Sequence, residues 1–570
     1  MSLIRAGPTL VAPPDHLSVP QFLLDGLDWH VTYPGRLAST PCLIDEESGQ
    51  KVFLEEVRYR RQAPDSSTTS LTLTPPATVI SPNHIAYGPC VWAVHRLGEL
   101  SPVVRTVIAQ FEYNRWNFQQ FQLAKPSIIF VHSDCLAPVV KAAAIVGLKS
   151  DRIVIIDTVR PLGFRNLCDL IHEAPTLPKF TERVLKPGEA KTTIAFLAPS
   201  SGTTGIQKVV SISHYNVISI VLQSATFNRI NEAYAPLAER RFRLGDLCCG
   251  FLPLYHIYGL VYNVRVGVST PLTLVLTPKF NFEIFLASIE KYQITHLTLV
   301  PPQAVLLCKH PASKRYDLSS VRYCIVAAAP LSASLTEELL QVLPNVQLGQ
   351  GYGLTETCGT VSMFPLTQKI GTLGSGGQLL PGTFAKVVKP DGTLAKDGEV
   401  GELYIRGGQV ALGYYDNDKA TYETFIDGWL KTGDQIYFQK GDIFVIERIK
   451  ELIKKVKGLQ VAPAELEGHL LTHESVVDAA VVGIPDEYSG ELPMAFVVIQ
   501  PELALMVDKN PDLAATLRAD IFKHVADVKS KHKWLTGGIQ FIAAIPRNGS
   551  GKILRRLLRE RIDSAMRARL

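Results

Sequence analysis

The chain has 570 residues, of which 46% are apolar and 19% charged, so it is long enough for several folded units and too apolar to be disordered. The net charge of +5 comes from 58 basic and 53 acidic residues spread along the chain, which argues against a nucleic-acid partner. The first residues lack the apolar core of a signal peptide, and Arg265 and Pro271 interrupt the apolar stretch 259–276, so we expect neither secretion nor a membrane span.

The first two thirds of the chain predict mixed helices and strands. Up to about residue 125 the apolar pattern is irregular, and the stretch 60–83 is so rich in Ser, Thr and Pro that we expect a loop there. From about residue 128 to 381, short β-branched runs such as 127–132 alternate with helical segments such as 213–225. Such alternation predicts βαβ units and largely parallel sheets.

The pattern changes towards the C-terminus. Charged, glycine-rich strands predict a β-rich subdomain over about 390–447. Residues 451–570 combine short apolar runs with amphipathic helices and predict a separate α+β unit. We therefore expect an α/β fold in which a large N-terminal domain of stacked sheets, residues 1–447, is followed by a boundary at 448–450 and a small C-terminal domain.

The segment 199–208, with the sequence PSSGTTGIQK, contains the parts of a triphosphate-binding loop. Gly202 and Gly205 allow the backbone to approach a ligand, the Ser and Thr hydroxyls offer donors, and Lys208 offers a cation. Two residues separate the glycines and Val209 follows the lysine, so this is not the P-loop of nucleoside triphosphatases. Taken alone, such a cluster is more often a solvated turn than a binding site.

Four further motifs follow in order: GYGLTE at 351–356, KTGD at 431–434, ERIK at 447–450 and GSGKILR at 549–555. Together the five motifs resemble the adenylate-forming superfamily of acyl-CoA synthetases, luciferases and nonribosomal-peptide adenylation domains. Within it, the chain is most similar to the 4-coumarate and arylacetate CoA ligases, including fungal members. The resemblance implies an ATP-dependent ligase that forms an acyl-adenylate and then an acyl-CoA, from an aromatic or medium-chain acid of secondary metabolism.

The resemblance also implies a nucleotide site. Lys552 would stabilise the charge that develops at the α-phosphate, which Thr355 would contact, and Glu356 would hold Mg²⁺ against the phosphates. Asp434 would accept hydrogen bonds from the ribose hydroxyls, and Arg448 would support ribose and phosphates. On their own, Asp434 would be a turn cap and Lys552 an exposed lysine. The implied ATP and AMP site comprises Ser200, Ser201, Gly202, Thr203, Thr204, Gly205, Lys208, Ala328, Gln350, Gly351, Tyr352, Gly353, Thr355, Asp434, Arg448, Lys450 and Lys552.

Three further features come from the same resemblance. Tyr352 would stack on the adenine, and Lys450 would be a hinge about which a mobile C-terminal domain withdraws Lys552 after adenylation. The implied acyl pocket comprises His256, Tyr258 and Ala327, although the apolar neighbours of His256 alone would favour a core histidine. The implied coenzyme A site comprises Lys457, Gly458, Leu459 and Gln460.

The chain departs from the family pattern at several positions. Gln207 and Val209 stand where the family has Pro and Gly, and Ala327 stands where it has Gly, so each adds a side chain near backbone that approaches the nucleotide. The hairpin after the hinge carries one extra residue, which leaves Lys454 and Lys455 both as candidates for the family's functional lysine. We expect a bulge or a longer turn to absorb this residue.

Two other functions fit the same motifs. The first is an acyl-AMP ligase that loads a carrier protein, although no carrier domain follows Lys552 in the chain. The second is a non-catalytic descendant that binds nucleotide or an acyl ligand, against which the retention of Glu356, Asp434, Arg448 and Lys552 argues.

The cysteines and the last residues suggest a location. The nine cysteines are scattered without C-x-x-C spacing, which suits a reducing compartment. The chain ends in Ala568-Arg569-Leu570, a small, a basic and a leucine residue that resemble the S-K-L type of peroxisomal address. We therefore expect import into peroxisomes by a receptor that reads this tripeptide, and a cytoplasmic location otherwise.

Overall fold

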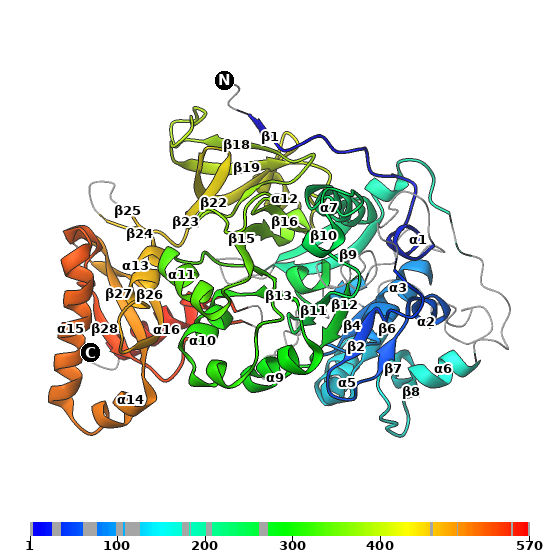
Figure 1. Ribbon diagram of the computed structural model, residues 1–570, viewed down its shortest axis with the longest axis horizontal. Helices are drawn as coiled ribbons and strands as arrows, with labels where there is room; N and C mark the ends of the chain where they lie inside the picture. The colour runs from blue at the N-terminus through cyan, green and yellow to red at the C-terminus, as the bar shows by residue number, and fades with distance from the viewer. Residues whose placement is uncertain are drawn as a thin grey trace.

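The protein folds into a large N-terminal domain and a smaller C-terminal domain (Figure 1). This is a computed structural model, and the residues it describes are 4–25, 36–60, 77–97, 106–108, 126–173, 182, 184–200, 208–261, 272–455, 460–486, 488–548 and 551–567. Within them, no helix is both long and apolar enough to cross a membrane. All nine cysteines are free and most are buried.

One sheet is formed mainly by the first 215 residues. In spatial order its strands are β20 (Gly413–Tyr414), β10 (Lys208–Ser213), β9 (Ile194–Ser200), β5 (Thr106–Ile108), β4 (Ala77–Ile80), β6 (Ile128–Val131), β7 (Ile153–Ile155) and β8 (Arg165–Asn166). The predicted loop over 60–83 is wrong at its end, because β4 is a buried strand that pairs in parallel with both β5 and β6. The four apolar or β-branched residues ATVI of β4 outweighed the prolines around them.

The second sheet is larger and continues from parallel into antiparallel pairing. Its order is β1 (Arg5–Ala6), β18 (Phe384–Val388), β19 (Gly401–Arg406), β22 (Trp429–Gln439), β23 (Asp442–Arg448), β17 (Gln378–Leu379), β16 (Gly359–Met363), β15 (Gln347–Leu354), β14 (Tyr323–Val326), β13 (His296–Leu299), β11 (Leu247–Gly250), β12 (Thr273–Leu276), β2 (Leu43–Asp45) and β3 (Lys51–Val52), with β21 (Phe425–Ile426) beside β22. The predicted parallel units are confirmed from β12 to β15, whereas every pairing from β15 to β1 is antiparallel. The strand-rich region begins at Phe384, slightly before the predicted start, and β1 extends it from the N-terminus.

Helices cover the sheets and bury their apolar faces. Those of the large domain are α1 (Val19–Leu24), α2 (Leu54–Arg60), α3 (Tyr87–Leu97), α5 (Leu136–Ile145), α6 (Leu167–Glu173), α7 (His214–Phe227), α9 (Phe282–Tyr292), α10 (Pro301–Lys309), α11 (Ala333–Val342) and α12 (Asp418–Thr424). Helix α7 is buried along most of its length between the two sheets, which fits its nearly continuous apolar sequence. Helices α9, α10 and α11 share a second core with β11, β13 and β14.

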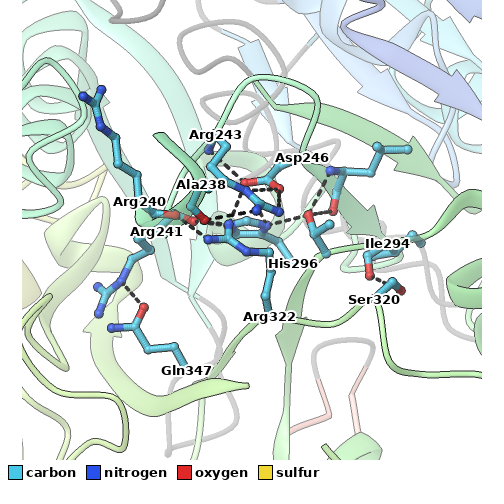
Figure 2. Close-up of polar contacts among 12 residues, drawn as sticks. Ala238, Arg240, Arg241, Arg243, Asp246, Ile294, His296, Ser320, Arg322 and Gln347 are labelled. Atoms are coloured by element: carbon cyan, nitrogen blue, oxygen red, sulfur yellow. Dashed lines mark hydrogen bonds and ion pairs between the residues drawn. The ribbon is translucent and has the colours of Figure 1, made fainter. Parts of the chain in front are cut away.

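A buried polar cluster ties together the amino ends of β11, β13 and β14, at the edge of the sheet opposite to their carboxyl ends. Figure 2 shows Arg243, His296 and Arg322 gathered around Asp246, and we name these four residues the internal cluster. The carboxylate of Asp246 lies 2.9 Å from the guanidinium groups of both Arg243 and Arg322. It also accepts the Arg243 backbone N–H at 2.8 Å. His296 makes a 2.8 Å hydrogen bond to the Arg241 carbonyl.

The C-terminal domain is the predicted α+β unit. Its elements are β24 (Ile453–Lys454), β25 (Gln460–Val461), α13 (Pro463–Leu470), β26 (Val476–Asp486), β27 (Gly490–Ile499), α14 (Pro501–Val507), α15 (Pro511–Val528), β28 (Gly538–Phe541) and α16 (Arg555–Arg567). Strands β26, β27 and β28 form one sheet, and α13 and α15 pack on it around a separate core. In Figure 1 this orange-to-red domain lies beside α10 and α11 of the large domain, and α10 contacts β26.

Candidate active site

Glu356 lies where the carboxyl end of β15 meets the hairpin of β9 and β10. Its Oε1 accepts hydrogen bonds from the Ser200 Oγ and from the Tyr414 hydroxyl, both at 2.9 Å. The Lys208 ammonium lies 4.4 Å from the centre of the Tyr414 ring. Ser200 and Lys208 pair across the hairpin, so the ends of the predicted phosphate loop face Glu356. The rest of that loop, Ser201, Gly202, Thr203, Thr204 and Gly205, lies outside the described residues.

Strand β15 requires its glycines for close backbone packing. A Cβ on Gly353 would lie 1.9 Å from the Gly359 carbonyl oxygen of the next strand, and one on Gly351 would lie 3.2 Å from Ile325. The strand is followed by a single 3₁₀ turn, Thr355–Thr357, which places Thr355 beside Glu356. The GYGLTE motif therefore brings a hydroxyl and a carboxylate to one strand end.

Asp434 and Arg448 face each other across the paired strands β22 and β23. Arg448 Nε lies 3.0 Å from Asp434 Oδ1, and the Tyr352 hydroxyl donates to Asp434 Oδ2 at 2.6 Å. Asp434 is 3% exposed, and its backbone N–H donates to Thr432 Oγ1 at 3.1 Å. The carboxylate of Asp434 raises the pKa of Arg448, whereas burial, followed by the charge of Asp434, raises the pKa of Tyr352. Tyr352 and Arg448, from two other motifs, thus both bind the carboxylate of Asp434.

The turn after β14 is held by Gln350. The Gln350 side chain accepts the Leu331 N–H at 2.8 Å and donates to the Leu331 carbonyl at 3.2 Å, so both of its polar ends bind this turn. Ala328 has φ +75°, a left-handed conformation that costs a non-glycine residue about 1 kcal/mol or more. Ala327, which replaces the customary glycine, donates its N–H to the Leu299 carbonyl at 3.1 Å.

Lys552 enters the site from the C-terminal domain. Its backbone N–H donates to Asn548 Oδ1 at 2.9 Å, and a Cβ on Gly551 would lie 3.1 Å from Val300, so this turn packs against the start of α10. Burial lowers the pKa of Lys552, and the nearby positive charge of Arg448 lowers it further. The predicted catalytic lysine and Arg448 therefore lie within electrostatic range of each other. Residues 549–550 of the motif lie outside the described part.

The two predicted acyl-pocket residues of the 250–258 segment lie at different depths. Burial, with a smaller effect of Lys552, lowers the pKa of His256 to about 4, so this imidazole is neutral near pH 7 and lies near the catalytic lysine. Tyr258 is packed against the cores on both sides of the sheet, and burial raises its pKa well above the usual value.

The hinge and the predicted thiol site are only partly described. Lys450 is exposed directly after β23. Gln460 is exposed and pairs with Lys454 across β24 and β25, while Lys457, Gly458 and Leu459 lie outside the described residues. The extra residue of this hairpin falls between Lys454 and Gln460, a stretch that is described only at Lys455, so the expected bulge or longer turn stays a prediction.

Sequence reasoning missed a set of carboxylates beside the hinge. Arg555, three residues after Lys552, lies 2.7 Å from Glu451, 2.8 Å from Glu467 and 3.9 Å from Glu447. We name Glu447, Glu451, Glu467 and Arg555 the hinge cluster. The only signal in the sequence is that Glu447 begins ERIK, Glu451 follows it and Arg555 follows GSGK. Glu451 and Arg555 are 104 positions apart, so no local pattern pairs them.

The hinge cluster contains more negative than positive charge. Burial raises the pKa of Glu447 to about 7, with Arg555 opposing this rise and Glu451 and Glu467 adding to it. Burial also raises the pKa of Glu467. Other cations near the cluster are Lys552, whose ammonium lies 3.9 Å from Glu451, Arg448 near Glu451 and Arg547 near Glu467.

Two protein-family models match the chain. Residues 118–415 match the family described as AMP-binding enzyme, and residues 465–552 match its C-terminal domain. The first match spans more than half of the chain and includes β9, β10, β15 and Glu356. The second begins within α13 and ends at Lys552.

Curated relatives and solved structures match over nearly the whole chain. The acyl-CoA ligase easD of Emericella nidulans is 32% identical over 96% of this chain and 97% of its own length. The peroxisomal OPC-8:0-CoA ligase 1 of Arabidopsis thaliana is 33% identical over 92% of this chain and 90% of its own. The crystal structure of the anthranilate CoA ligase AuaEII in complex with anthranoyl-AMP has a TM-score of 0.78 at 22% identity, covering 97% of this chain and 98% of that one.

Proposed function

The chain belongs to the AMP-binding enzyme family and is an AMP-forming acid–CoA ligase, and we propose that the residues around Asp434, Arg448 and Lys552 carry its chemistry. The observation that supports this assignment is the convergence of Tyr352, Asp434 and Arg448 with Lys552 of the C-terminal domain. These residues come from four motifs spread over 200 positions.

In the first step, a carboxylate oxygen of the acid attacks the α-phosphorus of ATP. The new O–P bond forms as the bond to pyrophosphate breaks, so an acyl-adenylate and pyrophosphate result. Negative charge increases on the α-phosphate oxygens, and the cations of Lys552 and Arg448 stabilise that charge. Asp434 accepts from the ribose hydroxyls, and Tyr352, held by its bond to Asp434, presents its ring to the adenine.

The donor set at the phosphates fits Mg²⁺. Mg²⁺ usually binds through one or two carboxylates together with substrate phosphates, and Glu356 is a carboxylate with Ser200 and Tyr414 on one oxygen only. Glu356 would hold the ion, with Ser200, Thr355 and Lys208 next to it. When bound, Mg²⁺ neutralises phosphate charge and polarises the phosphoryl oxygens.

In the second step, the thiol sulfur of coenzyme A attacks the acyl carbonyl carbon. The C–S bond forms, the C–O bond to AMP breaks, and the thiol proton passes to solvent. We place the hinge of this step at 448–450, so that a turn about Lys450 withdraws Lys552 and brings Lys457, Gly458, Leu459 and Gln460 to the thiol path. His256, with Ala327, would border the acyl group, and because its imidazole is neutral near pH 7 it offers a hydrogen bond rather than a charge.

Substrate and location are finer proposals. We propose an aromatic or medium-chain acid of secondary metabolism, which is supported by the fungal acyl-CoA ligase relative. We also propose peroxisomal import through Ala568-Arg569-Leu570, which lie outside the described residues. The peroxisomal ligase of Arabidopsis thaliana supports this location. Removal of the tripeptide from a chain with a fluorescent protein at its N-terminus should change punctate fluorescence, coincident with a peroxisomal marker, to diffuse fluorescence.

The function is tested by measuring pyrophosphate release across a panel of aromatic, medium-chain and hydroxylated acids, each with and without coenzyme A. An acid–CoA ligase releases pyrophosphate with a suitable acid and gives acyl-CoA and AMP when coenzyme A is present. Acyl-adenylate that never passes to coenzyme A would indicate a ligase for another acceptor, such as a carrier protein. Absence of pyrophosphate with every acid, from a folded protein, would favour a non-catalytic binder.

A further inference from the structure

Glu447 connects the two domains across the hinge. It lies in β23 of the large domain, where Oε1 accepts the Arg448 backbone N–H at 2.9 Å. Its Oε2 accepts the backbone N–H of Ala464, in the first turn of α13 of the C-terminal domain, at 3.2 Å. Ala462, the residue before α13, has no side-chain acceptor, so this helix takes its capping oxygen from the large domain.

Arg555 connects the same helix to the catalytic lysine. Its guanidinium donates to Glu467 of α13 at 2.8 and 2.9 Å and to Glu451 at 2.7 Å. The ammonium of Lys552 lies 3.9 Å from the same Glu451. These contacts lie after the hinge and move with the C-terminal domain, whereas the contact of Arg555 with Glu447 crosses the hinge.

We propose that Glu447 is a positioning residue for adenylate formation: by capping α13 and facing Arg555 it holds the C-terminal domain where Lys552 reaches the α-phosphate, and its contacts break when the domain turns. The inference rests on the proposed function. Turning about 448–450 would separate Glu447 from Ala464 and Arg555 but leave Arg555 paired with Glu451 and Glu467. Adenylate formation would therefore require the contacts of Glu447, and thioester formation would require them to break.

The charges around Glu447 explain why this connection can also open. Three carboxylates face one guanidinium, and Lys552 contacts only Glu451. Burying a third ionised carboxylate there is costly, in agreement with the raised pKa of Glu447. The capping bond favours the arrangement in the structure, and the ionised charge opposes it. Two substitutions separate these effects. Ala removes the cap and the charge, while Gln removes the charge and one of the two acceptor oxygens but can keep the other towards the Ala464 N–H.

The position of the C-terminal domain can be measured without using activity. A Cβ on Gly468 of α13 would lie 3.3 Å from the Ser332 Cβ at the start of α11, close to the 3.5–4.5 Å of a disulfide. Cysteines at both positions, S332C and G468C, should therefore form a disulfide in the arrangement of the structure. The rate of disulfide closure, followed by peptide mass spectrometry, reports how often the domains adopt it. At pH 6, where Glu447 with its pKa of about 7 is mostly protonated, we expect Glu447→Ala to slow closure about fivefold, the effect of one lost helix cap. We expect Glu447→Gln to speed closure severalfold at pH 8.

The half-reactions complete the test in the enzyme without added cysteines. At pH 6, where Glu447 is mostly protonated, Glu447→Ala should reduce acid-dependent ATP–pyrophosphate exchange about fivefold and should not slow thioester formation from supplied acyl-adenylate. Glu447→Gln should retain exchange and slow the thioester step at pH 8. The matched control is Glu465→Gln on α13, because the partners of Glu465, Lys529 and Lys533, both lie in the C-terminal domain. This variant should change neither the rate of disulfide closure nor the ratio of the two half-reactions.

Two outcomes would overturn the proposal. If both Glu447 variants had the same closure rates and the same ratio of half-reactions as Glu465→Gln, Glu447 would not position the C-terminal domain. Equal loss of both half-reactions, with slower closure in Ala and Gln alike, would make its role merely structural. Failure of the proposed function is a separate result, because the enzyme with Glu447 intact would then show no exchange while the closure rates would still report on the domains.

Discussion

The internal cluster and the hinge cluster are built from the same groups and differ in balance. In the internal cluster one carboxylate, Asp246, meets two guanidinium groups at 2.9 Å, and all of these residues belong to the large domain. In the hinge cluster three carboxylates meet Arg555, and one of them, Glu447, belongs to the other side of the hinge. In each cluster a carboxylate also accepts a backbone N–H: Asp246 accepts that of Arg243 in the internal cluster, and Glu447 accepts that of Ala464 in the hinge cluster.

The difference shows in the pKa values. Burial alone raises the pKa of Asp246, but His296, Arg243 and Arg322 outweigh it and the net shift is downward. At Glu447 the burial effect wins and the pKa rises to about 7. Where cations outnumber carboxylates, the carboxylate is stabilised in its ionised form and the cluster holds the strands together. Where carboxylates outnumber cations, ionisation of a carboxylate favours separation of the two domains.

The largest expected effect comes from breaking the internal cluster. Asp246→Ala leaves the guanidinium groups of Arg243 and Arg322 without their carboxylate. Removal of one partner of a fully buried pair costs about 3–5 kcal/mol, and because these two side chains are 29% and 21% exposed we expect about 2–3 kcal/mol. We expect the free energy of unfolding to fall by about this amount in urea, and both half-reactions to decline together with the folded fraction. A variant of normal stability would show that this cluster does not hold the sheet.

The next effect separates chemistry from folding. Lys552→Ala removes the cation next to Arg448, and loss of one group that stabilises transition-state charge costs about 100-fold or more in rate. Pyrophosphate exchange should fall by that factor. The rate of thioester formation from supplied acyl-adenylate should stay within about twofold of the parent, and the urea midpoint should equal that of the parent within error. Equal loss in the two half-reactions would contradict the assignment of Lys552 to the first step alone.

A pH series sharpens the contrast at the hinge. In the arrangement of the structure the pKa of Glu447 is about 7, against a usual value of 4.5, so this arrangement binds the proton more tightly than an opened one. The free energy by which protonated Glu447 favours this arrangement is fully present below pH 4.5 and is lost as the pH rises through 7. Disulfide closure between S332C and G468C, normalised to the thiolate fraction with a model thiol pair, should slow about tenfold from pH 6 to pH 8. The slope should vanish in Glu447→Gln, and a slope that survives there would assign it to another group.

The smallest effect lies within the large domain alone. Tyr352→Phe removes a 2.6 Å hydrogen bond to Asp434 and keeps the ring. We expect the KM for ATP to rise about fivefold, which corresponds to the net contribution of about 1 kcal/mol of one intramolecular hydrogen bond, with no change in the ratio of the half-reactions. A change in that ratio would show that the nucleotide site and the hinge are coupled through Asp434.

The contacts within motifs could be predicted from the sequence, and those between distant elements could not. The resemblance assigned Asp434 of KTGD and Arg448 of ERIK to the same ribose, and the structure pairs them across the hairpin of β22 and β23. Glu467 and Arg555 are 88 positions apart, and no local pattern pairs them. Strand β4 was missed because prolines and serines around Ala77–Ile80 masked a short apolar run.

Side-chain assignments within the site show the same limit. Gln350 stands in a nucleotide motif, but its amide oxygen and its amide NH2 both bind Leu331, which depends on how the turn after β14 folds back. Tyr258 is two positions after the His256 that lies near Lys552, yet it packs into the sheet cores. Residues so close in sequence can thus serve a site and a core, because burial is decided by the elements packed against them.

We expect the hinge cluster to open in the catalytic cycle while the internal cluster persists. Hydrogen exchange of the two backbone amides that donate to carboxylates tests this most directly. The backbone N–H groups of Ala464 and Arg243 are compared in the free enzyme, with a stable acyl-sulfamoyl-adenosine mimic of the acyl-adenylate, and with the mimic plus coenzyme A. Exchange at Ala464 should slow with the mimic and become fast again when coenzyme A is added, while exchange at Arg243 stays slow throughout. Unchanged exchange at Ala464 in all three states, or parallel changes at both amides, would contradict this account.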